Sequence, residues 1–334
     1  MPTPFSVMTW NVENLFRPAA HAEPGIEERY GRKLSLLGAV IAAIDPDVVA
    51  LQEAGGDAPL LDLQQALEGR YPHRRASTSP DGRGIGVAFL SKLAIADQDE
   101  LVDFPPGPAL DIHDLDADGR AVPITRMGRG ALRIRVTKDG ITVDVLTAHL
   151  KSKLLSYRRQ GGRTSFVPRD EGERAQVAGI ALMRRTAEAI TLRHHANQLL
   201  EGNLTTPLVV LGDLNDVPEA ATSQILTGPP GSEPRTPGFD RADLGDDARL
   251  FNLAPLIDPA QRFSRVHRGV GELLDQILAS EELFPRQANG RRSLPEVRSH
   301  TEFAGGLASV TEDPNLRRDD VAPDHAPVSA AFEL

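Results

Sequence analysis

The sequence predicts an α/β protein whose sheet contains strands of mixed direction. Three observations predict this class. Short apolar runs rich in Val, Ile, Leu and Thr recur along the chain, helical periodicity precedes two of them, and hairpin-like strands lie between them. Because helix–strand alternation favours parallel pairing and hairpins favour antiparallel pairing, we expect both kinds of pairing in one protein.

The expected strands are apolar runs that end in a polar or acidic residue, as buried strands do when their ends open onto a surface. Five such runs occupy residues 5–13, 48–53, 141–149, 208–215 and 273–278. The hairpin-like strands are 84–90 and 131–136.

The expected helices precede the second and fourth of these runs. In 27–44, apolar residues recur at helical spacing, and the pattern stops at Asp45, which precedes a proline and so disfavours a continued helix. Segment 171–200 repeats this pattern before Thr206 and Pro207.

Composition excludes several classes of protein. With 37 Lys and Arg against 47 Asp and Glu, the net charge is −10, so a basic surface of the histone kind is excluded and any polyanion must meet a local patch. There is no cysteine, which excludes thiolate metal sites and a cysteine nucleophile.

The N-terminus does not have the pattern of a signal peptide, and the longest apolar-rich stretch, 36–44, is too short to cross a bilayer. We expect a cytoplasmic monomer without membrane contact, folded as one domain over 1–334.

Eight polar residues are scattered over the chain, and almost all of them stand at or just past the ends of apolar runs. If the runs are neighbouring strands, the ends converge on one crevice. Carboxylates with amide oxygens suit Mg²⁺ or Mn²⁺, and histidines can contact a phosphoryl oxygen. The eight residues are Asn11, Glu53, His149, Asp213, Asn215, Asp275, Asp324 and His325.

Each of these residues has an ordinary interpretation when taken alone. Glu53 is typical of a strand-end carboxylate, His149 of a partly buried structural histidine, and the Asp213–Asn215 pair of a turn. Their joint occurrence is what predicts a site. By contrast, Asp114, Asp116 and Asp118 imitate the first half of a calcium loop without its twelfth-position Glu, so we interpret them as a turn.

Six short motifs carry a family resemblance over residues 9–328. In order, they resemble the motif series of the endonuclease/exonuclease/phosphatase superfamily, which includes DNase I-like nucleases, sphingomyelinases and inositol-polyphosphate phosphatases. The motifs are TWNVENLF at 9–16, ALQE at 50–53, TAHLKSK at 147–153, GDLND at 212–216, LLDQIL at 273–278 and PDHAPV at 323–328. The resemblance implies a four-layer α/β/β/α sandwich of two mixed sheets, as in DNase I.

The resemblance also implies a divalent-metal site. Asn11 and Glu53 would help hold Mg²⁺ or Mn²⁺, with Glu53 as a direct ligand, and Asp324 would lie at the metal or next to its ligands. Glu13 stands where several family members have Asp, so its role as a ligand is left open.

The remaining residues of the resemblance would act on the phosphate. Asp213 would orient or deprotonate the attacking water, and Asn215 would fix the phosphate. His325, paired with Asp275, would stabilise the developing charge. His149 matches the histidine that the DNase-like and sphingomyelinase-like branches place opposite His325.

A basic segment after His149 bears on the substrate. It carries Lys151, Lys153 and Arg158, followed by three more arginines before the first acid at Asp170. We interpret Lys151, Lys153 and Arg158 as substrate-binding residues, with a solvated loop as the alternative.

The function that we expect is a metal-dependent phosphodiesterase, and in the first place a nuclease that acts on DNA or RNA. A phosphatase, a sphingomyelinase-like lipid phosphodiesterase and a non-catalytic binding module on the same fold remain alternatives.

Overall fold

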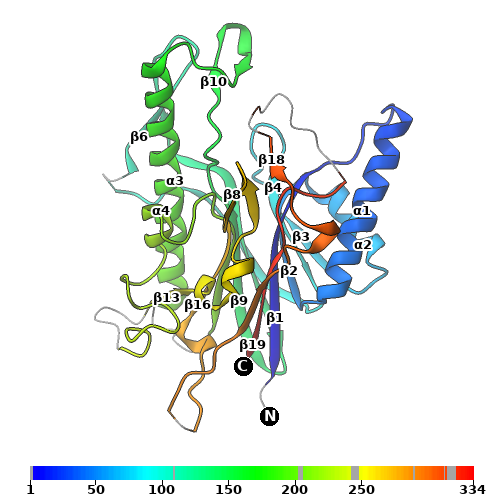
Figure 1. The fold of residues 1–334 in the computed structure, drawn as a ribbon, viewed down its shortest axis with the longest axis vertical. Helices are drawn as coiled ribbons and strands as arrows, with labels where there is room; N and C mark the ends of the chain where they lie inside the picture. Colours follow the sequence, from blue (N-terminus) through cyan, green and yellow to red (C-terminus); the bar gives the residue numbers. More distant parts are fainter. Residues whose placement is uncertain are drawn as a thin grey trace.

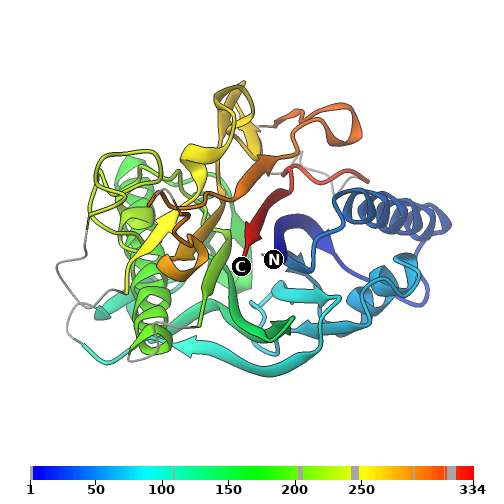
Figure 2. The ribbon, with the colours of Figure 1, turned by 90° about the horizontal axis from the view of Figure 1, so that it is seen from below.

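Two six-stranded mixed sheets pack face to face, with helices on their outer faces, in the computed structural model of the chain (Figures 1 and 2). The structure describes residues 3–107, 110–201, 206–241, 248–288, 290–311, 313 and 321–334. This arrangement is the α/β/β/α sandwich that the resemblance implies, so the predicted fold class is confirmed.

Each of the two sheets contains six strands, and in each sheet one central pair of strands is parallel. The first sheet contains, in spatial order, β17 (Glu296–Ser299), β19 (Val328–Glu333), β1 (Pro4–Leu15), β2 (Val48–Ala54), β4 (Gly86–Ser91) and β3 (His73–Ala76). The second contains β13 (Leu250–Asn252), β16 (Asp275–Ser280), β12 (Leu208–Asp213), β9 (Ile141–His149), β8 (Arg126–Lys138) and β5 (Ile95–Asp103). In each sheet a central pair is parallel, β1 with β2 and β9 with β12.

Helices connect the two parallel pairs. A parallel pair needs a long crossover, and α1 (Pro24–Ile44) and α3 (Glu171–Leu200) supply these. Figure 1 shows α1 and α2 (Asp57–Ala66) outside the first sheet, and α3 and α4 (Ala221–Gln224) outside the second. The helix periodicity and strand order in the sequence therefore predicted both crossovers correctly.

Shorter elements extend the sandwich. Small sheets are formed by β6 (Ile112–Leu115) with β7 (Ala121–Ile124), by β10 (Tyr157–Arg158) with β11 (Thr164–Ser165), and by β14 (Arg265–His267), β15 (Val270–Glu272) and β18 (Ser309–Val310). Short 3₁₀ helices cover Gln160–Gly162, Ala254–Leu256, Pro259–Gln261, Glu281–Leu283 and Phe303–Gly305. Among the described residues, none of the helices combines the length and apolar character needed to cross a membrane.

Several expected strand boundaries differ from those of the structure, and two of them, at β16 and β12, lie at the predicted site residues. The run 273–278 predicts a strand from residue 273, but β16 begins at Asp275, because Leu273 and Leu274 are buried without joining its strand ladder. The run 208–215 predicts a strand through Asn215, but β12 ends at Asp213, because Asn215 has a φ of 54° and cannot continue an extended strand. Apolar burial alone therefore does not mark the ends of a ladder.

Alternation along β1 shows how the sandwich directs side chains. Phe5 and Val7 belong to the core between the sheets, whereas Met8 and Trp10 pack beneath the helices of the first sheet. With a period of two, Asn11 returns to the inter-sheet side. The site residue on β1 thus points into the space between the sheets.

A buried polar bridge joins the sheets in this space. The Thr9 hydroxyl donates to Gln52 Oε1 at 3.1 Å, and Gln52 Nε2 donates to Thr147 Oγ1 at 3.0 Å. All three side chains are buried, so each polar atom in the bridge needs its partner. The bridge holds β1, β2 and β9 at a defined separation.

The acidic run in the β6–β7 hairpin is a turn, as interpreted. Asp116 Oδ1 accepts hydrogen bonds from the backbone N–H groups of Asp118 and Arg120, at 2.9 and 2.8 Å. Asp114 forms an ion pair with Arg158 at 2.8 Å. These carboxylates stabilise the turn and its contact with the 157–165 hairpin.

Gly212 permits the close approach of β12 to β9, and replacing it should damage the fold beside the site. A Cβ at this position would lie 2.0 Å from the backbone oxygen of Ala148. We expect Gly212→Ala to lower the free energy of unfolding by about 2 kcal/mol or more, because two backbone segments must move apart. Urea unfolding measures this, with Gly179→Ala in α3 as the control, since nothing lies within 4 Å of a Cβ there. Equal stability of the two variants would contradict the close-approach argument.

Candidate active site

Three neighbouring strands of the second sheet place three site residues in one row. In the strand register, Asp213 on β12 lies opposite His149 on β9 and opposite Asp275 on β16. All three side chains are buried, with 0–3% of their surface exposed. Because the register aligns these residues, strand pairing alone brings together positions that are separated by more than 60 residues in sequence.

Asp213 is the residue on which the contacts converge. Its Oδ2 accepts a hydrogen bond from Asn11 Nδ2 at 2.9 Å and lies 3.3 Å from His149 Nε2. Its Oδ1 accepts the backbone N–H of Asn215 at 2.9 Å. Burial raises the pKa of Asp213 to about 6, although His325 and Asn11 favour its charged form. The carboxylate is therefore a stronger base than an exposed aspartate and is still ionised near neutral pH.

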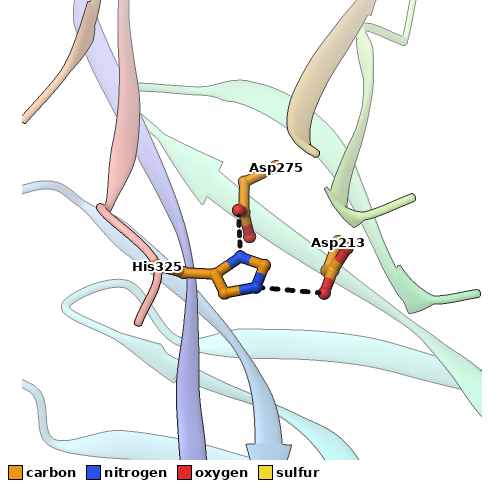
Figure 3. A group of neighbouring side chains, drawn as sticks. All are labelled: Asp213, Asp275 and His325. Atoms are coloured by element: carbon orange, nitrogen blue, oxygen red, sulfur yellow. Dashed lines mark hydrogen bonds and ion pairs between the residues drawn. The ribbon is translucent and has the colours of Figure 1, made fainter. Parts of the chain in front are cut away.

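His325 enters the site from the segment before β19 and is held at both ends. Its backbone oxygen accepts a hydrogen bond from Trp10 Nε1 at 2.8 Å. Its ring Nδ1 lies 2.6 Å from Asp275 Oδ2, and its Nε2 lies 4.0 Å from Asp213 Oδ2 (Figure 3). The Ser264 hydroxyl oxygen accepts the backbone N–H of Asp275 at 3.0 Å and so positions the other member of the pair.

The two histidines are held in opposite charge states. Burial would lower the pKa of His325, but Asp275, Asp324 and Asp213 outweigh it and raise the pKa to about 10. For His149, burial and the positive charges of Arg129 and His325 hold the pKa well below its usual range. At neutral pH His325 is a cation and His149 is neutral.

The first sheet contributes Asn11 and Glu53 from distorted strand ends. The register of β1 and β2 shifts after Asn11 and after Gln52, and Glu53 has a φ of 61°. A β-bulge of this kind changes the direction in which a side chain such as that of Glu53 points. Glu53 Oε1 lies 3.4 Å from Asn11 Nδ2, and Glu53 Oε2 accepts the backbone N–H of Asn14 at 3.0 Å. The contact of Asn11 with both Glu53 and Asp213 joins the two sheets at the site.

Asn215 and Asp324 lie at the margin of this group. Asn215 Nδ2 donates to the backbone oxygen of Leu150 at 3.0 Å, which anchors it to the end of β9. Asp324 Oδ2 forms an ion pair with Arg265 at 3.2 Å, and its Oδ1 lies 3.9 Å from His325 Nε2. The backbone N–H of Glu13 donates to Asn11 Oδ1 at 3.0 Å. Glu13 thus orients Asn11 through its main chain.

The donor set fits a hard divalent cation. Ligand atoms of Asp213, Asp275 and His325 all lie within 4.8 Å of one another, and Glu53 lies across Asn11 from them. Asp275 Oδ1 is a buried carboxylate oxygen without a hydrogen-bond partner among the described residues. An oxygen-rich group of this kind is typical of magnesium and manganese sites. Since His325 Nδ1 is bonded to Asp275, Glu53 with Asn11 is the better holder of a cation.

The basic segment after His149 carries less uncompensated positive charge than its sequence indicates, because carboxylates pair with two of its basic residues. Lys153 forms ion pairs with Asp216 at 3.0 Å and Glu272 at 3.4 Å, and Arg158 forms one with Asp114. Lys151 is different, because its Nζ donates to the backbone oxygens of Ser152 and Leu154, at 3.1 and 3.4 Å. The acids that neutralise Lys153 and Arg158 come from distant segments, which a local charge count cannot include.

Sequence reasoning missed a further basic group beside His149. Arg129 on β8 and Arg83 in the turn before β4 both lower the pKa of His149 through their charge. Arg129 Nε lies 3.2 Å from Asp81 Oδ2, which also pairs with Arg83. Neither arginine stands in one of the six motifs, so no local signal in the sequence identifies them.

Comparisons with known proteins agree with this architecture. A model of the Endonuclease/Exonuclease/phosphatase family matches residues 8–299. Truncated TDP2 of Caenorhabditis elegans is similar at 15% identity and a TM-score of 0.54, covering 99% of this chain and 98% of that chain. The human Nocturnin catalytic domain with bound sulfate is similar at 14% identity and a TM-score of 0.54, covering 99% and 94%.

A bacterial structure is similar to the same extent. A family protein of Bacteroides thetaiotaomicron has 14% identity and a TM-score of 0.52, covering 99% of this chain and 98% of that chain. A search of curated proteins found no match. At these identities the solved structures show a shared fold.

The Asp275–His325 pair can be tested by titration. We expect Asp275→Asn to lower the pKa of His325 by about 1 to 3 units, because an adjacent carboxylate no longer favours the imidazolium. Since the folded pKa is about 10 and the unfolded value about 6.5, the pair adds stability that is complete below pH 6.5 and is lost as pH rises through 10. Histidine ring NMR in EDTA measures the pKa, and urea unfolding at pH 6 and pH 10 measures the stability change.

The control for this titration is Asp103→Asn, at an exposed position that ends the edge strand β5. It should leave the His325 titration unchanged. A pKa of His325 that is the same in wild type and Asp275→Asn would contradict the assigned pairing.

Proposed function

The chain belongs to the endonuclease/exonuclease/phosphatase family, and from this premise we propose that it is a divalent-metal-dependent phosphodiesterase that cleaves nucleic acid. The family and fold are those of phosphoric ester hydrolases. The observation that carries the proposal is the position of Asp213 between a neutral and a cationic histidine.

A phosphodiester resists hydrolysis because its negative charge repels a nucleophile. Catalysis therefore needs an aligned water, a base for its proton and positive groups that meet the developing charge. Glu53, assisted by Asn11, would hold a Mg²⁺ or Mn²⁺ ion, whose contribution when bound is Lewis acidity at a phosphoryl oxygen. The other contributions come from side chains of the chain.

Asp213 would act as the base. Its pKa of about 6 leaves it ionised at neutral pH yet able to accept a proton from water. Asn11 Nδ2 and the Asn215 N–H each donate to one of its oxygens, so the carboxylate cannot rotate freely. Because the carboxylate is fixed, Asp213 would accept the proton from a water molecule in one defined orientation.

The two histidines would have different roles, His325 at the phosphate and His149 at the Asp213 carboxylate. Cationic His325, held by Asp275 through Nδ1, directs its Nε2 proton toward the site and would stabilise a negatively charged oxygen. Neutral His149 holds a single ring proton, and the contact with Asp213 Oδ2 keeps it on Nε2. Asn215, anchored to Leu150, would position the phosphate.

Positive groups on one side of the site support a nucleic acid substrate. The positive charges of Lys151, Arg129 and Arg83 all lower the pKa of His149, and a phosphate bound next to His149 would interact favourably with the same charges. Lys153 and Arg158 would join them as substrate-binding residues by exchanging their carboxylate partners for phosphates. In a chain of net charge −10, such a local patch is what a polyanion requires.

Replacing the proposed base should remove activity without unfolding the protein. We expect Asp213→Asn to lower kcat by about 10²-fold or more, because the side chain keeps its shape but cannot accept a proton. The assay uses supercoiled plasmid and single-stranded RNA with Mg²⁺ or Mn²⁺, with EDTA as the metal-free arm. Asp103→Asn is the matched control and should retain full activity.

Other substrates in the same assay separate the alternatives. Release from p-nitrophenyl phosphate alone would replace the proposal with a phosphatase, and cleavage of sphingomyelin vesicles alone with a lipid phosphodiesterase. If no substrate is cleaved and Mg²⁺ does not raise the melting temperature, a non-catalytic binding module is favoured.

Salt dependence tests whether the positive groups bind a nucleic acid backbone. With several phosphate contacts, KM for an oligonucleotide should rise by about 10-fold or more between 50 and 200 mM salt, because bound counterions are released on association. Arg129→Gln should reduce the slope of log KM against log salt by about 1. A slope near zero in the wild type would count against a polyanionic substrate.

A further inference from the structure

A cavity of about 450 Å³ lies between the N-terminal half of α3, residues 151–158 and the β6–β7 hairpin. In Figure 1, β10 and the N-terminal end of α3 extend beyond the end of the sheets opposite the two termini. The volume lies in the range of small-molecule sites. The cavity therefore has room for a ligand that extends from the site.

Lys151 links the cavity to the active site. It lines the cavity and follows His149 by two residues. Its backbone N–H donates to Glu188 Oε2 at 2.6 Å, and its backbone oxygen accepts a hydrogen bond from Arg185 Nη1 at 3.0 Å. Because α3 holds the main chain of Lys151 on both sides, the cavity has a fixed position relative to His149.

Two basic side chains of the lining come from the segment after β9 and from α3. Lys151 and Arg184 both line the cavity, and no ion pair of Lys151 with a carboxylate occurs within the described part of the chain. Arg184 Nε is buried without a hydrogen-bond partner among the described residues, and it lies 3.4 Å from Glu188 Oε1. Burial and the charge of Arg184 lower the pKa of Lys151 to about 8, which an anion bound here would reverse.

The acids around the cavity are already engaged. Asp114 pairs with Arg158, and Glu173 pairs with Arg159 and Arg169. Asp170 Oδ1 accepts the backbone N–H of Glu173 at 2.8 Å and caps α3. Of the basic side chains in the lining, Lys151 therefore has no carboxylate partner within the described residues, and Arg184 faces the buried Glu188 at 3.4 Å.

Another part of the lining is apolar and partly accessible. Leu154 and Leu155 contribute from the loop, and Val177 and Ile180 from one face of α3, three residues apart. All four side chains are half-buried. A ligand that fits this lining carries an anionic group together with a group that packs on apolar side chains.

We propose that this cavity binds the nucleotide next to the scissile bond, with that nucleotide's phosphate against Lys151 and Arg184 and its base against Leu154, Val177 and Ile180. The inference rests on the proposed function and refines it. A nucleotide combines an anion with a ring that can pack on these apolar side chains, and Lys151, two residues after His149, relates the cavity to the end of β9 that carries His149. The enzyme thereby recognises a nucleoside, and not only a phosphodiester group.

The test fills the cavity and compares matched substrates. Ile180→Trp and Val177→Trp place a large ring in the cavity, and Leu182→Trp places the same ring at a position on α3 that is 49% exposed and does not line it. The substrates are the p-nitrophenyl phosphodiesters of thymidine, esterified at the 5′ or the 3′ oxygen, and methyl p-nitrophenyl phosphate. They share a leaving group and differ in the nucleoside.

We expect the wild type to cleave one thymidine ester with a kcat/KM at least about tenfold above the methyl ester. Ile180→Trp and Val177→Trp should abolish this advantage with methyl ester cleavage within about twofold of wild type, and Leu182→Trp should keep it. Equilibrium dialysis with adenosine 5′-monophosphate in EDTA should show binding to the wild type and Leu182→Trp, and at least about tenfold weaker binding to Ile180→Trp.

The outcomes separate this inference from the proposed function. Nucleotide binding that Ile180→Trp weakens, without cleavage of any ester, would leave the cavity site intact and refute the phosphodiesterase. Cleavage of all esters at equal efficiency, with nucleotide binding absent or unchanged in Ile180→Trp, would overturn the cavity site and leave the phosphodiesterase intact. Thermal unfolding checks that each variant is folded.

Discussion

The register of β12 between β9 and β16 is the constraint on which the rest of the site depends. It sets His149, Asp213 and Asp275 side by side and leaves them buried. Gly212 makes this packing possible, since any side chain there would collide with the backbone of Ala148. A shift of the register by one residue would turn Asp213 to the opposite face of the sheet and leave the histidines without their shared carboxylate.

Burial then gives the grouped residues their chemical differences. Two histidines a few ångströms from the same carboxylate differ in charge because one is bonded to Asp275 while the other faces Arg129 and His325. In water both would titrate near the same pH. The protein obtains a cationic group and a neutral donor from one residue type by placing acids around one ring and bases around the other.

Helix α3 connects the catalytic end of the second sheet to the proposed substrate site. Glu188 accepts hydrogen bonds from the backbone N–H groups of Gly128 and Lys151, so one buried carboxylate ties β8 and the end of β9 to the helix. The same helix lines the cavity with Val177, Ile180 and Arg184. The proposed catalytic residues and the proposed substrate contacts thus share one rigid support, which is the arrangement that precise positioning requires.

Hydrophobic periodicity in the sequence determined an α/β protein of mixed strand direction with two long helices, and strand-end polar residues identified the grouped residues, because both signals are local. The four-layer sandwich followed from the motif resemblance. The sequence could not determine the exact ends of β12 and β16, which depend on ladder pairing and on the φ of Asn215. Tertiary structure alone decided that Asp216, Glu272 and Asp114 neutralise the basic segment and that Arg129 and Arg83 approach His149. The physical reason is that electrostatic interaction depends on distance in space, and folding brings together charges that lie up to 119 residues apart in the chain.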